Sequence, residues 1–366
     1  MTGIYIHVPF CERKCPYCAF YSVPKSGQLV DKYLDTLVRE MASVKDNVQA
    51  DTIYFGGGTP PLLGAENIAK VISFIDKQID MTRPEITVEC NPNSITPDAL
   101  KALRSAGVNR LSVGVQSLDD GELRFLGRLH NVLQAEQTIE NALSAGFENI
   151  SADLMMGIKG QTAAAVEKAV SRLEALGVKH ISVYMIKTEP GTPFDSDAVR
   201  ASLSDEDELS ELYLSVVKSC EDHGFTQYEI SNFSRPGFES RHNLKYWLCE
   251  EYLGFGPSAH SYFGGVRYRN ADTLDGYSSP DFGRVVTDPS PDRAEEYVML
   301  GLRLNRGISL VKAASLGFGE EWREDAVSLA QRLGSNELCV FDGDRLSLTP
   351  KGMLVSNSVI GKLIYV

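Results

Sequence analysis

The sequence predicts an α/β protein in which a partial, (βα)6-type TIM-like barrel precedes a smaller, winged-helix-like α+β domain. Three observations carry this prediction. Up to residue 232, short β-branched runs alternate with amphipathic helical stretches, which is the pattern of βα units around a parallel sheet. A weak internal repeat marks the joins between these units. Beyond a segment rich in Gly, Pro, Ser and Asp, the pattern changes to helices and a hairpin.

The repeat consists of three similar segments, SAGVNRLSV, SAGFENISA and ALGVKHISV, which begin at residues 105, 144 and 175. Each places a helix-ending Gly before a strand. Six or seven such units fall short of the eight of a closed barrel, so we expect an open, partial barrel. The expected strands are Ile4–Val8, Thr52–Phe55, Glu85–Cys90, Arg110–Val115, Ile150–Met155, Ile181–Ile186 and Gln227–Ser231.

The chain is expected to divide into three regions. Residues 1–232 form the barrel, residues 233–291 an irregular segment that ends in a linker, and residues 292–366 the C-terminal domain. In the last region, LCVFDGDRLSLT predicts a hairpin that turns at Asp342–Asp344. Its nine basic and ten acidic residues argue against a DNA-reading wing and favour a lid or an interaction domain.

The composition excludes several classes of protein. With 366 residues, 43% of them hydrophobic and 23% charged, the chain is globular. A formal net charge of -13 would repel a phosphate backbone, so nucleic acid is not an expected partner. The start, MTGIYIHVPF, lacks the features of a signal peptide, and no stretch has the ~18 uninterrupted apolar residues of a spanning helix. We expect a cytoplasmic protein without a transmembrane segment, with peripheral membrane contact left open.

Three of the seven cysteines, Cys11, Cys15 and Cys18, form a C-x3-C-x2-C motif directly after the first expected strand. Three thiolates in one loop can hold a [4Fe-4S] cluster and leave one iron open to another ligand. A structural zinc site usually adds a second pair of ligands, and none is visible near this loop. We therefore expect an open [4Fe-4S] cluster, while zinc and unligated thiols remain as alternatives.

Polar or glycine residues follow several strands at the same predicted edge of the barrel. The run Gly56–Pro60 follows the second strand, where its bare backbone can approach a ligand and offer N–H and C=O groups. Glu89, Gln116 and Asp153 lie at the ends of the next three strands, and Arg128 follows one loop later. In TIM-type barrels this carboxyl edge is the active face. A buried acid at a strand end can also be structural, so this pattern alone does not settle the function.

The motifs YIHVPFC, GGGTP, ECNP, GVQS, DLMMGIKGQT and EPGTPF, together with the cysteine loop, resemble the radical S-adenosylmethionine (SAM) proteins of the oxygen-independent coproporphyrinogen oxidase family. The resemblance runs from Ile4 to about His260. It implies that the open iron binds the amino and carboxylate groups of SAM, and that an electron donor reduces the cluster, which then cleaves the sulfonium. The SAM-binding residues that it implies are Tyr5, Tyr17, Gly57, Gly58, Thr59, Glu89, Gln116, Arg128 and Asp153.

Two features separate the branches of that family. The oxidases carry a further cysteine two residues past the third ligand, where this chain has Phe20. In addition, Arg241–Trp247 contains an H-N-x-x-Y motif that resembles the HemW-type heme chaperones, which bind heme and pass it to acceptor proteins. This resemblance implies heme as a ligand, with His242 and Tyr246 as its candidate contacts.

Other assignments of these residues stay open. His260 and Cys249 are the second and third candidates for the heme ligand, and His242 could instead only stabilise local structure. We expect a cytosolic heme chaperone that carries a [4Fe-4S] cluster with an exchangeable SAM and serves an unknown acceptor. The alternative is a radical SAM enzyme acting on a tetrapyrrole, either an oxygen-independent coproporphyrinogen III oxidase or a heme-degrading relative. A zinc-binding structural protein is a third, weaker alternative.

Overall fold

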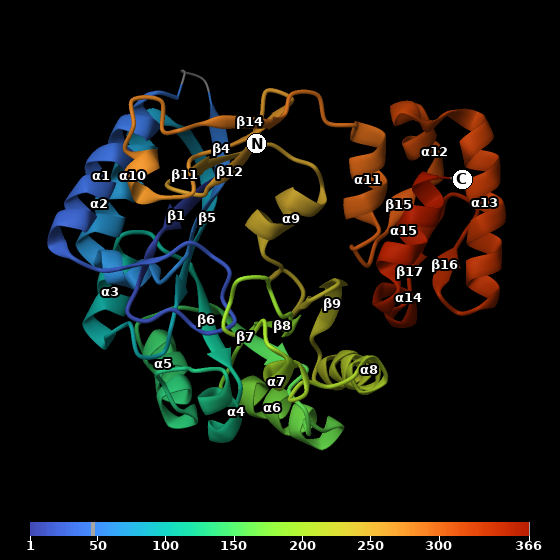
Figure 1. Ribbon diagram of the computed structural model, residues 1–366, viewed down its shortest axis with the longest axis horizontal. Helices are drawn as coiled ribbons and strands as arrows, with labels where there is room; N and C mark the ends of the chain where they lie inside the picture. Colours follow the sequence, from blue (N-terminus) through green and yellow to red (C-terminus); the bar gives the residue numbers. More distant parts are fainter. Residues whose placement is uncertain (45–47, 366) are drawn as a thin grey trace.

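The computed structural model describes residues 1–44 and 48–365. Figure 1 shows a curved sheet with helices α1 to α6 around its outer side, and a separate group of C-terminal helices across from it. Helix α9 (Arg241–Trp247) lies between these two parts. No helix among the described residues is both long and apolar enough to cross a membrane.

The main sheet has twelve strands in the order β14-β13-β12-β11-β1-β4-β5-β6-β7-β8-β10-β9. Six consecutive members of this order, from β1 to β8, run parallel and correspond to the first six expected strands. The open, partial barrel predicted from the sequence is therefore confirmed. The parallel strands are β1 (Thr2–Val8), β4 (Gln49–Gly57), β5 (Asp80–Cys90), β6 (Arg110–Gln116), β7 (Asn149–Met156) and β8 (His180–Met185). Strands β10 (Asn232–Ser234) and β9 (Thr226–Glu229) follow β8 as an antiparallel edge.

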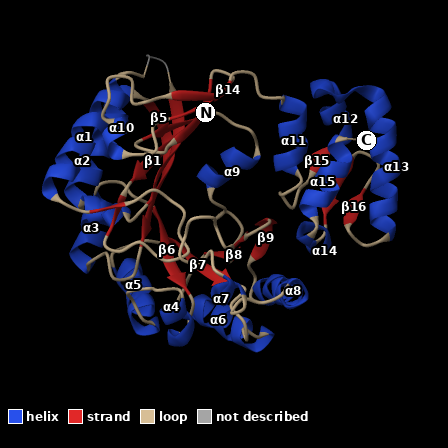
Figure 2. Cartoon of the chain, in the orientation of Figure 1, coloured by secondary structure: helices blue, strands red, loops and turns tan. Residues whose placement is uncertain are grey.

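Amphipathic helices cover the outer face of this sheet, as the strand and helix colours of Figure 2 show. Most begin with a side chain that caps the first free N–H groups, for example Asn131 and Asp205, which each form a capping box. The helices are α1 (Gly27–Ala42), α2 (Ala65–Gln78), α3 (Pro97–Ser105), α4 (Asp120–Phe125), α5 (Val132–Ser144), α6 (Ala163–Ala175), α7 (Asp197–Arg200) and α8 (Glu206–Asp222), with a 3-10 turn η1 (Pro60–Leu63).

The two faces of the parallel strands differ in chemistry. Successive side chains of a strand point to opposite faces. In β1, Ile4 and Ile6 are fully buried in the core that packs on the helices, and they alternate with Tyr5 and His7. The other strands likewise send polar side chains to the concave face, where Tyr184 of β8 is 41% exposed. The concave face of this barrel is thus polar, unlike the packed apolar layers of a closed TIM barrel.

The segment 233–291, expected to be irregular, in fact extends the main sheet. Strand β11 (Tyr252–Phe255) pairs parallel with β1, and the antiparallel strands β12 (His260–Phe263), β13 (Val266–Arg269) and β14 (Val285–Asp288) follow it. Each of these strands has four residues, which is too short for a clear period-two pattern. Between β13 and β14, the short helix α10 (Leu274–Tyr277) packs back toward α1.

The C-terminal region has the predicted α+β character. Its hairpin consists of β16 (Cys339–Phe341) and β17 (Arg345–Leu348), with Gly343 at φ +106° in the predicted turn. The C-terminal region joins the barrel at the β9 edge, where the N–H of Ile230 donates to the carbonyl of Arg303 at 3.0 Å. The remaining elements are α11 (Arg293–Gly301), β15 (Ile308–Ser309), α12 (Leu310–Ala313), a π-helical turn η2 (Ala314–Phe318), α13 (Gly319–Ser335), α14 (Pro350–Leu354) and α15 (Ser356–Ile364).

Candidate cofactor site

The cysteine loop leaves the sheet at the carboxyl end of β1. A short parallel pair closes the loop, because β2 (Phe10–Cys11) binds β3 (Val23–Pro24). All three cysteines are half-buried, and burial raises the pKa of the Cys18 thiol, with the nearby Cys15 and Cys11 adding to the effect. Metal binding would have to displace that proton. Among the described residues, no three His, Cys, Asp or Glu side chains converge on a position for a single metal ion.

Arg128 connects this loop to the rim of the sheet. Its Nη1 donates to Cys15 Sγ at 3.3 Å and to the Tyr17 hydroxyl at 3.2 Å. Its Nη2 donates to the Asn91 side chain and to the carbonyl of Gly114. Both terminal nitrogens of the guanidinium therefore already have protein partners, and Arg128 positions groups from three segments of the chain.

Asn91 is a rim residue that the sequence analysis did not single out. Besides accepting from Arg128, it donates through Nδ2 to Thr59 Oγ1 at 3.0 Å, and Thr59 Oγ1 in turn faces Cys11 Sγ at 3.8 Å. The signal was present in the ECNP motif, two residues after Glu89. Asn91 thus links the ends of β4 and β5 to the cysteine loop.

The glycine run fits tightly against β1. A Cβ on Gly58 would lie 2.6 Å from the carbonyl oxygen of Phe10, and one on Gly57, which has φ +103°, would lie 2.5 Å from the His7 ring. The N–H groups of Gly58 and Thr59 donate to Val8 and Phe10 carbonyls, and that of Gly57 donates to Glu89. The expectation that these N–H groups face a ligand needs correction, because the protein itself uses them. The turn can still offer carbonyl oxygens, while Asn91 and Cys11 already engage the Thr59 hydroxyl.

Two acids lie deep in the concave face and keep some access to it. Glu89 accepts from the Tyr54 hydroxyl at 2.7 Å and from the Gly57 N–H at 3.2 Å. Burial, with a smaller contribution from the neighbouring Asp153, raises the pKa of Glu89 to about 7. Burial also raises the pKa of Asp153, which accepts from the Ser112 hydroxyl at 2.9 Å. The structure therefore brings these two predicted residues to the same concave face of the sheet.

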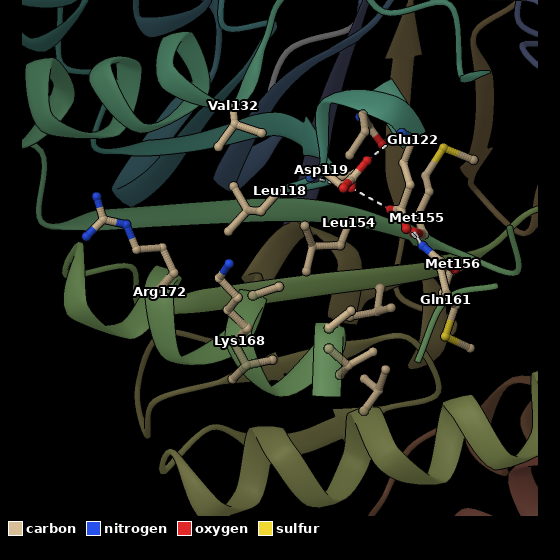
Figure 3. Close-up of a pocket in the computed structure, with 18 of the residues that line it drawn as sticks. Leu118, Asp119, Glu122, Val132, Leu154, Met155, Met156, Gln161, Lys168 and Arg172 are labelled. Atoms are coloured by element: carbon tan, nitrogen blue, oxygen red, sulfur yellow. Dashed lines mark hydrogen bonds between the residues drawn. The ribbon is translucent and has the colours of Figure 1, made fainter. Parts of the chain in front are cut away.

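Gln116 lies at the edge of this concave face. It has φ +66°, and its amide lies beside Gly114, close to Asn91 and Arg128. On its other side a cavity of about 580 Å³ extends between the strands β6 to β8 and helix α6. Leu118, Val132 and Leu154 line this mostly apolar space, with Lys168 and Arg172 on α6 (Figure 3). The cysteines, Glu89 and Asp153 do not line it, so the candidate cofactor site lies on the concave side.

Helix α9 packs the H-N-x-x-Y residues against β4, where His242 stacks on Tyr54. His242 is buried, 1% exposed, with Nδ1 at 2.8 Å from Thr52 Oγ1 and Nε2 at 2.8 Å from the Tyr246 hydroxyl. Burial lowers the pKa of His242 to about 3, so its ring is neutral. In this conformation neither nitrogen is open to a heme iron. Tyr246 instead reaches a cavity that Tyr5 of β1, a predicted SAM-binding residue, also lines.

Two family matches define the class of protein. Residues 5–173 match the Radical SAM superfamily, and residues 288–355 match the HemN C-terminal domain, whose start had been expected at residue 292. The solved structure of coproporphyrinogen III oxidase (HemN) from Escherichia coli has a TM-score of 0.82 at 21% identity, covering 99% of this chain and 89% of that chain. The fold and the cysteine loop thus define a radical SAM protein with a HemN-type C-terminal domain.

Relatives of similar length narrow this class to one family. The heme chaperone HemW of Bacillus subtilis is 37% identical over 100% of this chain and 99% of its own. HemW of Lactococcus lactis is 34% identical over 99% of this chain and 97% of its own. The chain belongs to the HemW family of heme chaperones. The predicted family is therefore confirmed, and the superfamily implies a [4Fe-4S] cluster and SAM as cofactors.

Proposed function

We propose that the protein binds heme and hands it intact to an acceptor protein, and that it carries a [4Fe-4S] cluster on Cys11, Cys15 and Cys18. The observation that carries this proposal is the full-length similarity to proteins named heme chaperones. Phe20 supports it, because a cysteine stands at that position in the oxidases that the chain resembles. An electron donor for the cluster and a heme acceptor are the partners that this function requires.

The residues of the loop fit an open cluster. The three thiols belong to one loop, which the β2–β3 pair closes, and Arg128 and Thr59 direct N–H and O–H groups to two of the sulfurs. Hydrogen bonds to the sulfurs are one of the means by which proteins tune such clusters. When bound, the cluster supplies an electron and SAM supplies the sulfonium that accepts it.

The rim fits the methionine end of SAM through acceptors for the N–H groups of its amino group. Those acceptors are the carbonyl oxygens of the glycine turn and the Glu89 carboxylate, which the Tyr54 hydroxyl and the Gly57 N–H hold in place. Asp153 and Gln116 are the proposed partners of the nucleoside hydroxyls. Arg128 acts indirectly, since its terminal nitrogens hold Cys15, Tyr17 and Asn91.

The test offers two tetrapyrroles separately to the anaerobically reconstituted protein, heme and coproporphyrinogen III, with SAM and a reductant. We expect heme to bind and to keep its mass, and coproporphyrinogen III to remain undecarboxylated. Mass spectrometry of the tetrapyrrole and chromatography of SAM products give the answer. The appearance of protoporphyrinogen IX with repeated turnover would establish the enzyme in place of the chaperone, with Phe20 a neutral change.

A further inference from the structure

A second cavity, of about 420 Å³, opens beside the cysteine loop and has a different chemistry from the polar rim. This volume is within the ~300–1,000 Å³ of small-molecule sites. Aromatic rings form most of its wall, and they come from β1, the cysteine loop, α9 and β11. The rings are those of Tyr5, Phe20, Tyr21, Tyr246 and Tyr252.

Phe20 is the exposed member of this aromatic wall. Its side chain is 65% exposed, although it is large and apolar. An aromatic ring that remains exposed at the mouth of a cavity favours a flat apolar ligand, because stacking would remove both surfaces from water. Phe20 is also the residue that replaces the additional cysteine of the oxidases. The substitution thus puts a packing surface at the cavity mouth in place of a thiol.

His260 at the start of β12 is the histidine of this cavity that is open to a ligand. Its ring is exposed, and no hydrogen-bond partner for it is found among residues 1–44 and 48–365. His7, which also lines the cavity, differs because its Nδ1 lies 3.0 Å from the Tyr5 hydroxyl. Burial lowers the pKa of His260, with Arg269 adding to the effect, so the imidazole is neutral near pH 7. Neutral imidazole is the form that binds a metal.

Two arginines and their acidic partners surround His260. Arg269 lies directly opposite His260 in the β12–β13 pair and therefore on the same face of the sheet. Arg267 is the second cation near the ring, and Asp272, which pairs with Arg269, is the neighbouring anion. Glu296 binds Arg267 at 2.6 Å. Both cations are thus paired with acids, and Arg269, the one opposite His260, would exchange Asp272 for a carboxylate at the edge of a bound ring.

We propose that this aromatic cavity is the heme site of the protein and that His260 is the axial ligand of the iron. Phe20 and Tyr252 pack on the macrocycle, and Arg269 binds a propionate. His242 is then a positioning residue, which acts on the cavity through its 2.8 Å hydrogen bond to the Tyr246 hydroxyl. This inference rests on the proposed heme-binding function and assigns it to a place in the fold.

The test titrates the anaerobically reconstituted full-length chain with hemin and, separately, with metal-free protoporphyrin IX. His260→Ala should lose the histidine-ligated absorption and electron paramagnetic resonance spectra of the hemin complex and regain them when free imidazole is added. It should bind protoporphyrin IX as the wild type does, because that ligand has no iron. Phe20→Ala should weaken both ligands, by about tenfold, since it removes packing and not ligation.

Two substitutions outside the aromatic cavity serve as matched controls. His223→Ala removes a half-buried histidine at the end of α8, and Leu133→Ala removes a side chain on α5 that is 70% exposed. Neither should change either titration, and iron-sulfur content should be the same in all variants. If the wild type binds no hemin, the proposed function itself fails. If the wild type binds hemin and His260→Ala keeps the hemin spectrum, this site assignment is wrong. A hemin spectrum that is then lost in His242→Ala would identify α9 as the source of the axial ligand.

Discussion

For single residues at the rim, the sequence reveals which residues matter but not which partners they bond. The identities of Cys11, Cys15, Cys18, Glu89 and Asp153 could be recognised from spacing and strand position. Their hydrogen bonds could not, because they depend on side chains that are distant in sequence. The H-N-x-x-Y motif shows the limit most clearly, since nothing in its letters indicates that both ring nitrogens of His242 are already bonded.

At this scale the first prediction concerns the cluster ligands. Replacing Cys11, Cys15 and Cys18 together by Ala should abolish bound iron and acid-labile sulfide, because no thiolate then remains in the loop. Replacing Cys249, which is half-buried and outside the loop, should leave both unchanged. Iron and sulfide analysis after anaerobic reconstitution measures this. Iron that persists in the triple variant would contradict the assignment of these three cysteines as the cluster ligands.

The second prediction concerns the charge of Glu89. Its folded-state pKa is raised to about 7, so the carboxyl is mostly neutral below that pH and charged above it. If the charged Glu89 accepts a hydrogen bond from the amino group of SAM, affinity for SAM should rise as the pH increases from 6 to 8. Glu89→Gln should bind SAM more weakly and lose this rise, while it keeps the cluster. Calorimetry measures the affinity for SAM across this pH range. An identical pH profile in the wild type and in Glu89→Gln would exclude the contact between Glu89 and SAM.

Among the secondary-structure elements, the parallel strands were predictable and the β11–β14 extension was not. Strands β1 and β4 to β8 each carry β-branched residues with helices between them, and their outer faces are continuously apolar. Strands β11 to β13 have four residues each and alternate poorly, and their pairing is settled by partners far along the chain. The local hydrophobic pattern of the sequence therefore predicts the barrel strands, whereas tertiary contacts determine which strands pair at the edge of the sheet.

A prediction at this scale tests how the cysteine loop is attached to the rim. Arg128→Lys keeps the positive charge but cannot reach Cys15, Tyr17, Asn91 and Gly114 together, because an ammonium lacks the planar fork of a guanidinium. We expect a lower cluster content per chain and a nearly unchanged unfolding temperature. Lys substituted for the exposed Arg124 of α4 is the matched control. Wild-type iron content in Arg128→Lys would show that the loop holds its shape alone.

For the whole molecule, a buried carboxylate fastens the sheet extension to the barrel. Glu40 on α1 is fully buried and accepts from the Tyr277 hydroxyl at 2.6 Å, Asn270 Nδ2 at 2.7 Å and the Gly256 N–H at 3.0 Å. It also pairs with Arg284 at 2.8 Å. These partners all belong to the segment that the sequence analysis expected to be irregular.

Glu40→Ala should therefore destabilise the fold by about 3–5 kcal/mol, the usual effect of removing one partner of a buried ion pair. The control is Asp275→Ala, which removes an exposed ion pair to Lys32 between the same two helices, α1 and α10, and should have little effect. Denaturant unfolding of both variants measures the difference. Equal stability of the two variants would mean that the Glu40 network does not hold the extension.

The central claim, that the protein transfers heme without altering it, is tested most directly by a handover measurement. The reconstituted protein is loaded with one equivalent of heme, given SAM and a reductant without oxygen, and mixed with an apo-globin as a general heme acceptor. We expect the globin spectrum to appear, with heme of unchanged mass and no SAM cleaved in proportion to heme. A tetrapyrrole of altered mass, formed as SAM is consumed, would contradict the claim.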